Sequence, residues 1–315
     1  MNKYVFLPSV LLLFISCKMI TNSDKQFGIV DENKIYRLRL NPAAGSKYFY
    51  DISNQSEIKL EVNSTKIDNI NKTTVGVSYA VSKDSLGNFL INMQYDKIKI
   101  YSKTADTETE MDADNAALTS NPVEKMLGIL KTASITATVS PAGEVKSVTG
   151  YKELTAKVLE KLAATDTYAR TTAQTQWEQF VEKGFVKTNL DQLFKIFPDS
   201  AVHIGDKWKL NIEQSAELGL MAKSSFLLKE INNDVAVIIS TGEIKSDSTP
   251  ANLMGQVVTA NLKGRQEGEY EMNIRTGMLI KSNITATVEG TIQMMGREIP
   301  VKVKSAINMN GKKLD

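Results

Sequence analysis

The sequence predicts an α+β fold, predominantly antiparallel β-sheet, in two similar halves with a helical segment between them. Apolar residues recur at every second position over residues 35–102 and again from residue 207 to the end, which is typical of strands with one buried face. Over residues 151–197 they recur instead at helical spacing. An order of strands, then helices, then strands favours antiparallel sheets over βαβ units.

The composition narrows the class of protein. The chain has 315 residues, enough for one large domain or two ordinary ones, and its 42% hydrophobic and 23% charged residues suit a folded globular protein. A net charge of +2 without a basic tract argues against nucleic acid as a partner. A single Cys and a single His disfavour a Cys/His zinc site, a thiol–histidine dyad and a disulfide framework.

Residues 1–16 have the features of a lipoprotein-type signal peptide. Lys3 supplies the positive charge, and the apolar stretch after it is shorter than the ~20 residues that a bilayer span needs. The stretch ends in FISC, which resembles a bacterial lipobox and finishes at Cys17. The resemblance implies cleavage before Cys17, diacylglycerol on its thiol and acylation (palmitate or a similar chain) of the new N-terminus. The alternative is an ordinary signal peptide that happens to contain a cysteine.

Residues 17–31 are polar and are expected to form a lipidated tether between the membrane and the fold. Each buried CH₂ of an acyl chain contributes ~0.8 kcal/mol, so two or three chains anchor a soluble domain durably. The membrane is therefore expected to be a partner through the lipid on Cys17.

The first β-rich half is predicted to span residues 32–150. Its acidic stretch 105–115 is expected to be a loop, and Asn121 with Pro122 predicts the start of a helix. Alternating segments predict strands around residues 36–40, 48–52, 58–62, 75–81 and 89–95, and a hairpin formed by 135–139 and 144–148.

Residues 151–198 are predicted to be the helical segment, which Pro198 ends. Residues 199–315 are predicted to be the second β-rich half. Its alternating segments predict strands around residues 208–212, 235–239, 270–274, 284–288 and 299–303.

Two stretches of the chain resemble each other. GSKYFYDISNQSEIKLEV (45–62) and GDKWKLNIEQSAELGLM (205–221) both open with Gly, a polar residue, Lys and an aromatic residue. ITATV also occurs twice, at 135–139 and 284–288. These matches favour a degenerate duplication with insertions. The alternative is convergence, because hairpins reuse few residue types.

His203, the only histidine, lies next to Asp206 in sequence and invites a catalytic interpretation. A histidine base needs a nucleophile within reach, and the chain contains no G-x-S-x-G elbow. We therefore expect Gly205 and Asp206 to form a turn before a strand that starts at Lys207, with Trp208 in the core. No catalytic residue is predicted, and the protein is expected not to be an enzyme.

The acidic run TETEMDADN (107–115) could supply oxygen ligands to calcium, but it lacks the Gly and the terminal Glu of an EF-hand. A solvated loop is the favoured interpretation. No P-loop, dinucleotide fingerprint or H-E-x-x-H motif is present, so no metal-binding or cofactor-binding residue is predicted.

Three short segments resemble the Asp-Ser/Thr-aliphatic acceptor motif that is used for O-glycosylation in the phylum Bacteroidota. The resemblance implies modification of Ser85, Ser200 and Ser248, each of which follows an Asp.

The lipobox ending at Cys17, PAGEVKSVTGYKEL (141–154) and FPDSAVHIGDKW (197–208) together resemble an uncharacterised family of Bacteroidota cell-envelope lipoproteins. The resemblance covers roughly residues 30–310. It implies a place in the bacterial cell envelope, and it implies no activity, because the family is a domain of unknown function.

We expect a lipid-anchored envelope protein, at the outer membrane, that binds a hydrophobic ligand or another envelope component without catalysis. One-sided sheets with helices to cover them, and a second half rich in Met, support this expectation. The alternative is a structural or assembly partner at the outer membrane that has no ligand cavity. A periplasmic and a surface-exposed position both remain open.

Overall fold

The computed structural model describes residues 34–62, 65–104, 107–162, 185–215, 218–253 and 256–315. Most of this chain forms thirteen strands: β1 (Lys47–Val62), β2 (Thr65–Lys83), β3 (Phe89–Thr104), β4 (Thr107–Asp112), β5 (Ile135–Val139), β6 (Val145–Thr149), β7 (Lys207–Ser215), β8 (Leu220–Asn232), β9 (Val235–Ser246), β10 (Ala251–Leu253), β11 (Gln256–Asn273), β12 (Leu279–Met294) and β13 (Arg297–Leu314).

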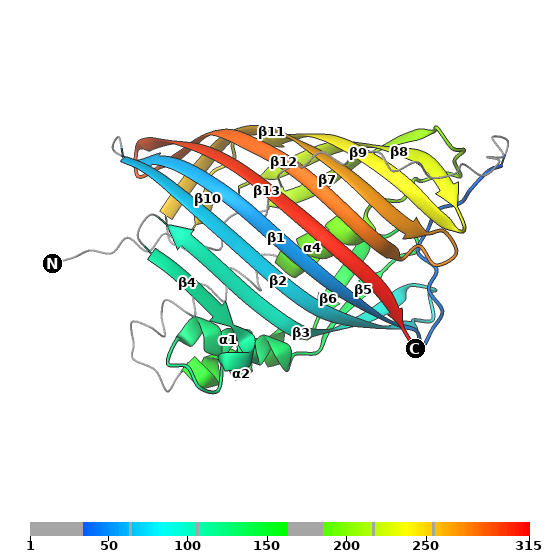
Figure 1. Ribbon diagram of the computed structural model, residues 1–315, viewed down its shortest axis with the longest axis horizontal. Coiled ribbons are helices and arrows are strands. Elements are labelled where there is room, and N and C mark those ends of the chain that lie inside the picture. Colours follow the sequence, from blue (N-terminus) through cyan, green and yellow to red (C-terminus); the bar gives the residue numbers. More distant parts are fainter. Residues whose placement is uncertain (1–33, 63–64, 105–106, 163–184, 216–217, 254–255) are drawn as a thin grey trace.

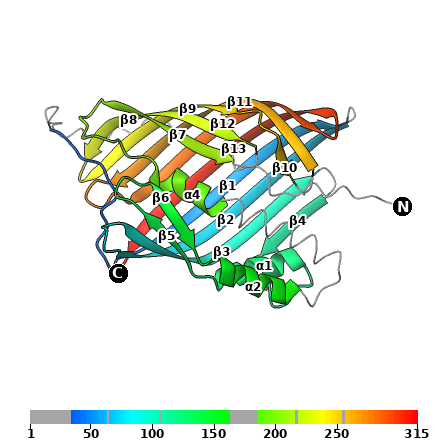
Figure 2. The same ribbon diagram turned by 180° about the vertical axis from the view of Figure 1, so that it is seen from behind.

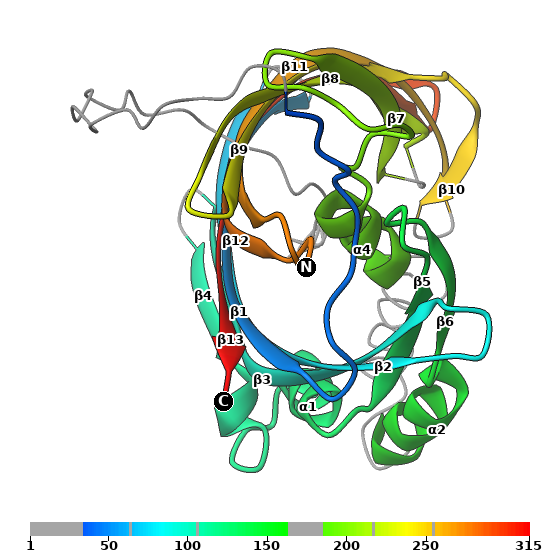
Figure 3. The same ribbon diagram turned by 90° about the vertical axis from the view of Figure 1, so that its right-hand side faces the viewer.

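All thirteen strands belong to one antiparallel sheet, in the order β6-β5-β3-β2-β1-β13-β12-β11-β9-β8-β7, with β4 added to β3 and β10 added to β11. Most strands that follow one another in the chain pair with one another, although β5 pairs with β3 and β9 pairs with β11. The first and last strands also pair, from Lys47↔Leu314 to Leu60↔Val301. The sheet curls strongly, so that it has a concave and a convex face (Figure 1, Figure 3).

Within the described residues, three helices and one short 3-10 turn, η1 (Ala113–Asn115), interrupt the strands: α1 (Pro122–Lys131), α2 (Tyr151–Leu162) and α4 (Phe185–Phe194). Helix α1 starts where the sequence predicts, because the side chain of Asn121 accepts a hydrogen bond of 2.9 Å from the amide of Val123. Helices α1 and α2 pack together beside β3 and β4 (Figure 1).

Helix α4 lies on the concave side and contacts both β6 and β7, the strands at the two ends of the sheet (Figure 2, Figure 3). An uncovered end strand exposes a row of backbone groups that can pair with another chain. Helix α4 therefore stands between the two ends of the sheet.

A segment before β1, residues 36–41, crosses one opening of the curled sheet (Figure 3). Its backbone amides donate hydrogen bonds of 2.8, 2.9 and 2.7 Å to the carbonyls of Val202, Pro141 and Thr276. We call this segment the strap. It joins the strand-linking turns that contain Pro141 and Thr276 to the chain that enters β7.

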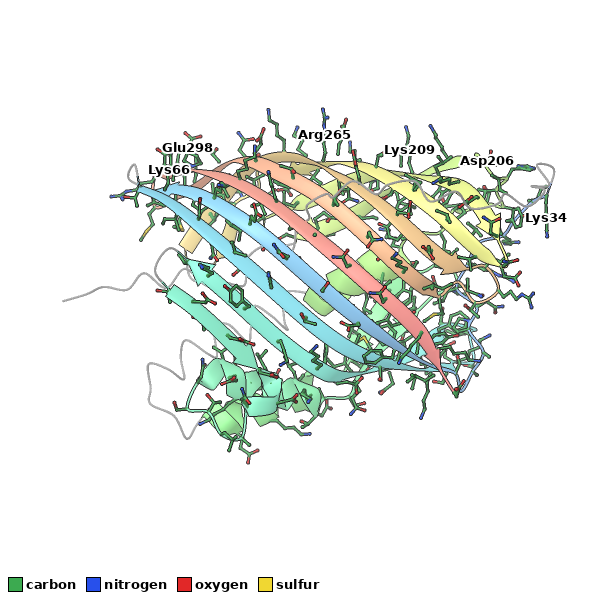
Figure 4. The ribbon with its side chains drawn as sticks, viewed as in Figure 1. Lys34, Lys66, Asp206, Lys209, Arg265 and Glu298 are labelled. Atoms are coloured by element: carbon green, nitrogen blue, oxygen red, sulfur yellow. The ribbon has the colours of Figure 1, made fainter. Side chains whose placement is uncertain are left out.

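The two faces of the sheet differ in chemistry, because alternate residues of a strand point to opposite faces. The concave face carries the buried apolar side chains, and the convex face carries charged ones such as Lys209 and Arg265, which point away from the sheet (Figure 4). Convex-face charges pair across strands, as Lys302 does with Glu289 at 3.0 Å. The convex face is therefore the solvated face.

The prediction of an α+β fold in two similar halves is wrong. The pairing of β1 with β13 joins the N-terminal and C-terminal strands into one continuous ladder, so the sheet is not divided into halves. The described helices are short, of at most 12 residues, whereas β2 alone has 19. The fold is a single antiparallel sheet with minor helical additions.

The expected loop at 105–115 is also wrong for its described residues. Residues 107–112 form β4, which pairs with β3. Two cross-strand ion pairs support it, Lys99 with Asp112 at 2.5 Å and Lys103 with Glu108 at 3.7 Å. The alternation of Thr and acidic residues is thus the period of an exposed strand.

The strand expected at 36–40 is reduced to one isolated bridge, between Tyr36 and Val202. Leu38 and Leu40 are nevertheless buried, because the strap packs on the core without joining the sheet.

Candidate functional site

A line of small and polar residues crosses the middle of the concave face, and we call it the polar row. Each member lies directly opposite the next on the neighbouring strand, so all of them point to the same face. In sheet order from β8 to β3 they are Ser224, Gly242, Gln266, Ala286, Ser305, Ser56, Asn71 and Ser102.

Every side chain of the polar row is uncharged, and all six polar ones are buried. The next row of the concave face, two residues along each strand, is mainly apolar. It contains Ala222, Ile244, Val288, Val303 and Ile58. Polar groups in such surroundings cost free energy unless they find hydrogen-bond partners.

On the β8–β11 side, two members of the polar row form a hydrogen bond with each other. Gln266 Nε2 donates a hydrogen bond of 3.0 Å to Ser224 Oγ. The two residues are separated by β9, where the facing position is Gly242. A Cβ at Gly242 would lie only 2.9 Å from Gln266 Cγ and 2.9 Å from Ser224 Oγ, so the absence of a side chain is what lets them meet.

On the β13–β2 side, several buried polar atoms have no hydrogen-bond partner within the described residues. Both amide atoms of Asn71 and the hydroxyl of Ser305 have no hydrogen-bond partner among the described residues, and neither does Oδ1 of Asn54. Asn54 lies on β1, two residues before Ser56, and also faces the concave side. Asn71 and Asn54 are each 8% exposed and Ser305 is 1% exposed. Each such group costs about 1–3 kcal/mol if nothing fills the position.

An aromatic cluster stands beside the satisfied part of the row. The indole of Trp208 stacks on Phe226 with 5.7 Å between ring centroids, and Phe226 contacts Tyr270 at 6.0 Å. Trp208 Nε1 also donates a hydrogen bond of 3.0 Å to the carbonyl of Ile196, which fixes the chain after α4 against β7. Trp208 packs against the core but is only half-buried.

A second aromatic cluster joins α4 to β1 and β2. The rings of Tyr50 and Tyr79 lie 5.0 Å apart, and Phe194 at the end of α4 lies 6.4 Å from Tyr79. Tyr79 is eight residues along β2 from Asn71, or about 26 Å at the rise of a strand. The contact with Phe194 is therefore far from the unpartnered part of the row.

Four tyrosines of the concave face, Tyr50, Tyr79, Tyr95 and Tyr270, stay neutral. Burial raises the pKa of Tyr95 and of Tyr270 to about 12, and it raises the pKa of Tyr50 and Tyr79 further above the ordinary value. These phenols therefore bring no negative charge to the lining near neutral pH.

His203 belongs to a turn, as the sequence predicts. The carboxylate of Asp206 accepts a hydrogen bond of 2.8 Å from the backbone amide of His203, and this bond holds the pKa of that carboxyl below its usual value. His203 Nδ1 lies 3.2 Å from the same carboxylate. Gly205 has a φ of +93°, which favours glycine, and β7 begins at Lys207. Asp206 sits at an end of the sheet and is exposed (Figure 4).

The other predicted positions stand apart from the polar row. Ser85, Ser200 and Ser248 are exposed and lie outside the strands, which leaves their O-glycosylation a prediction. Cys17 lies outside the described residues. Within the described ranges, no group of three or more His, Cys, Asp or Glu is placed to hold a metal ion.

The convex face carries a depression of about 950 Å³ over β9, β11, β12 and β13. Its lining has five cations, Lys245, Lys263, Arg265, Lys302 and Lys304, and three carboxylates, Glu243, Glu267 and Glu289. Lys302 pairs with Glu289, and Arg265 lies directly opposite Glu243, so part of the positive charge is matched within the sheet. The concave face is the more specific candidate site.

Sequence reasoning missed the polar row. Its signal is visible in β1, where the alternation continues but Asn54 and Ser56 replace apolar residues between Ile52 and Ile58. A polar residue at an inward position is informative only when the neighbouring strands are known, because a row is a property of the register.

Comparisons with known proteins give little beyond the family. No curated protein matches the chain. The translocator domain of autotransporter NalP from Neisseria meningitidis is 8% identical, with 86% of this chain and 90% of that chain covered and a TM-score of 0.23. An outer membrane channel from Pseudomonas putida F1 is 6% identical, with 91% and 100% covered and a TM-score of 0.22. Nothing is carried over from either protein at such low similarity.

In the part of the chain that the structure describes, no helix has the length and apolar character to cross a membrane. One family model does match, over residues 86–279, which is more than half of the chain. The match includes PAGEVKSVTGYKEL and FPDSAVHIGDKW, the segments that predicted membership of an uncharacterised family. It runs from the β2–β3 turn to the start of β12 and covers the Gln266–Ser224 side of the polar row. The chain belongs to DUF6263, a family of unknown function.

Proposed function

We propose that this protein is a lipid-anchored lipoprotein of the bacterial cell envelope, at the outer membrane, that binds an apolar ligand on the concave face of its sheet without catalysing a reaction. The anchoring part of the proposal rests on the lipobox-like FISC ending at Cys17 and on the polar tether that follows it.

The ligand part rests on one observation, the opposite chemistry of the two faces of a strongly curled sheet. Charged side chains cover the convex face, while apolar side chains line the concave face. A sheet with one apolar face needs a second layer against it. On the concave side, the described chain supplies α4 and the strap, which are short beside strands of 16–19 residues. An apolar ligand would complete that layer.

The absence of catalysis is proposed on the chemistry of the lining. The polar row contains only Ser, Gln, Asn, Gly and Ala, and the buried phenol of Tyr270 on β11 is held neutral. His203 and Asp206 form hydrogen bonds with each other in a turn at the end of the sheet. General acid–base catalysis needs a group that titrates near the working pH.

The anchor is tested by feeding labelled palmitate to cells that express the protein. The wild-type chain should incorporate label, and a Cys17→Ala variant should not. Equal incorporation by both would exclude Cys17 as the site of acylation.

The ligand is tested with a pair of neighbouring residues on β12. Ala286 points into the concave face, and Thr287 points to the convex face. The full-length protein should bind the apolar fluorophore N-phenyl-1-naphthylamine, Ala286→Trp should bind it much less while keeping its melting temperature, and Thr287→Trp should match wild type. If the wild-type protein does not bind the fluorophore, or if Ala286→Trp binds it unchanged, the proposal fails.

A further inference from the structure

We infer that the β13–β2 side of the polar row, with Asn71, Asn54 and Ser305, binds the uncharged hydrogen-bonding group of an amphipathic lipid, such as a neutral glycerolipid with ester and hydroxyl groups. The inference rests on the proposed function, because it names the chemical class of the apolar ligand and the place where its polar end lies.

These side chains are buried without hydrogen-bond partners among the described residues. Asn71 and Asn54 are 8% exposed and Ser305 is 1% exposed, yet four of their polar atoms have no hydrogen-bond partner within the described chain. Buried polar groups in folded proteins are nearly always paired with protein, water or a ligand. These groups therefore mark a position where a further molecule supplies hydrogen bonds.

The unpartnered side chains lie close together on neighbouring strands. Ser305, Ser56 and Asn71 lie directly opposite one another on β13, β1 and β2, and Asn54 is two residues from Ser56 on the same face. Neighbouring strands are about 4.8 Å apart, so Ser305 and Asn71 are separated by about 10 Å across the sheet. A group with several polar atoms matches that spread better than a single hydroxyl.

The unpartnered atoms include both hydrogen-bond donors and hydrogen-bond acceptors. The amide of Asn71 offers a donor at Nδ2 and an acceptor at Oδ1, Asn54 offers an acceptor, and the hydroxyl of Ser305 can act as either. A partner for all of them must both accept and donate. Ester carbonyls accept and free hydroxyls do both, so a partly esterified glycerol has the required complement.

The polar row carries no charge that could bind an ionised headgroup. No member of the polar row is ionisable, and the buried tyrosines of the same face are held in their neutral form. An ionised phosphate or carboxylate buried there would lack a counter-charge, which is strongly unfavourable. A neutral lipid therefore fits this part of the row, and an anionic lipid does not.

The β8–β11 side of the same row supplies the internal contrast. Gln266 and Ser224 are equally buried but bond to each other at 3.0 Å, so they need no ligand. One further buried hydroxyl without a partner among the described residues, Ser240 Oγ on β9, lies on the β8–β11 side, whereas the β13–β2 side groups four such atoms. The polar end of the lipid is thus assigned to the β13–β2 side, and its chain is expected to run over the apolar rows on either side.

The test compares two asparagines of the same strand. Asn71 has unpartnered amide atoms, whereas Asn69 Oδ1 accepts a hydrogen bond of 3.4 Å from Ser102. Full-length protein, immobilised on beads through its C-terminus and washed free of detergent, is equilibrated with radiolabelled 1-monooleoylglycerol or with radiolabelled hexadecane, both below their aggregation limits.

Asn71→Leu should weaken the binding of monooleoylglycerol at least tenfold and leave the binding of hexadecane unchanged. Its melting temperature should equal or exceed that of wild type, which shows that the lost affinity is not lost folding. Asn69→Leu should lower the melting temperature instead, with monooleoylglycerol and hexadecane affected alike.

The outcomes separate this inference from the proposed function. Wild-type protein that binds neither probe overturns both. Wild-type protein that binds both, with Asn71→Leu unchanged for monooleoylglycerol, overturns only the inference and assigns the leftover groups to ordered water. Tighter binding of oleate than of monooleoylglycerol at pH 8 overturns the assignment to an uncharged group.

Discussion

The β8–β11 and β13–β2 sides of the polar row are buried to the same degree but differ in how their polar atoms are satisfied. On β8–β11, a long amide side chain spans a glycine and reaches a serine, Gln266 to Ser224 over Gly242. On β13–β2, Ser305, Ser56 and Asn71 are consecutive neighbours, and no such internal bond is formed by Ser305 or by the amide of Asn71.

The difference teaches that burial alone does not reveal what a polar residue does. A buried amide that bonds within the protein stabilises the fold, and one left open costs stability until a partner arrives. A row of polar residues on one face can thus contain both kinds. Substitutions should separate them by the sign of their effect on stability.

The largest effect is expected at the aromatic residue that flanks the satisfied side. Phe226 is fully buried and contacts both Trp208 and Tyr270. Phe226→Ala should lower the free energy of unfolding by about 3–5 kcal/mol, because it removes a large, fully buried side chain. Denaturant unfolding measures it, with Leu227→Ala, on the convex face of the same strand, as the control. Equal losses would mean that the two faces are not distinct.

The next effect is expected within the satisfied side. Gln266→Leu leaves the hydroxyl of Ser224 buried without its partner and should cost about 1–3 kcal/mol in the free energy of unfolding. The double variant with Ser224→Ala should recover part of that loss, because neither polar group then remains. Additive losses in the double variant would show that the bond contributes nothing.

A change of opposite sign is expected on the other side. Asn71→Leu removes two unpartnered amide atoms from an interior position, so the free energy of unfolding should stay the same or rise by up to about 2 kcal/mol. Thermal unfolding of ligand-free protein measures it. A clear loss of stability would show that Asn71 has a structural partner and would remove the contrast between the two sides.

The smallest effect separates the uncharged row from the charged surface. Hydrogen bonding from Lys99 lowers the pKa of Asp112, so the stability that this pair contributes is present above the pKa of the unfolded carboxyl and is lost as pH falls through the lowered value. Asp112→Asn should lower the melting temperature by at most about 2 °C at pH 7 and by nothing at pH 2. The effect of Asn71→Leu should be the same at both values, and a pH-dependent effect would contradict an uncharged row.

Local features of the fold follow from the sequence. The alternation that predicts strands also predicts their inward side, so Val301 and Val303 on β13 are buried as expected. The helix start at Asn121, the hairpin of β5 and β6 and the turn before Lys207 depend on nearby residues, and the structure has all three.

Pairing between distant strands could not be predicted in the same way. Nothing local in β1 specifies β13 as its neighbour, since the two are about 250 positions apart, and both present ordinary alternating patterns. The resemblance between residues 45–62 and 205–221 supported the prediction of two similar halves, whereas the β1–β13 ladder joins the N-terminal and C-terminal strands into one sheet. The polar row depends on that same register, because Ser305 meets Ser56 only through it.

The β1–β13 ladder also has a consequence for the order of folding. The strand that joins β1 to β12, residues 297–314, leaves the ribosome and any export channel after the other strands of the sheet, so the edges of β1 and β12 must wait for it. Contacts between the two ends of a chain form slowly, and open strand edges invite pairing with other copies. A chain that stops before Arg297 would keep both edges open for good, and its fate would be aggregation rather than a smaller version of the same sheet.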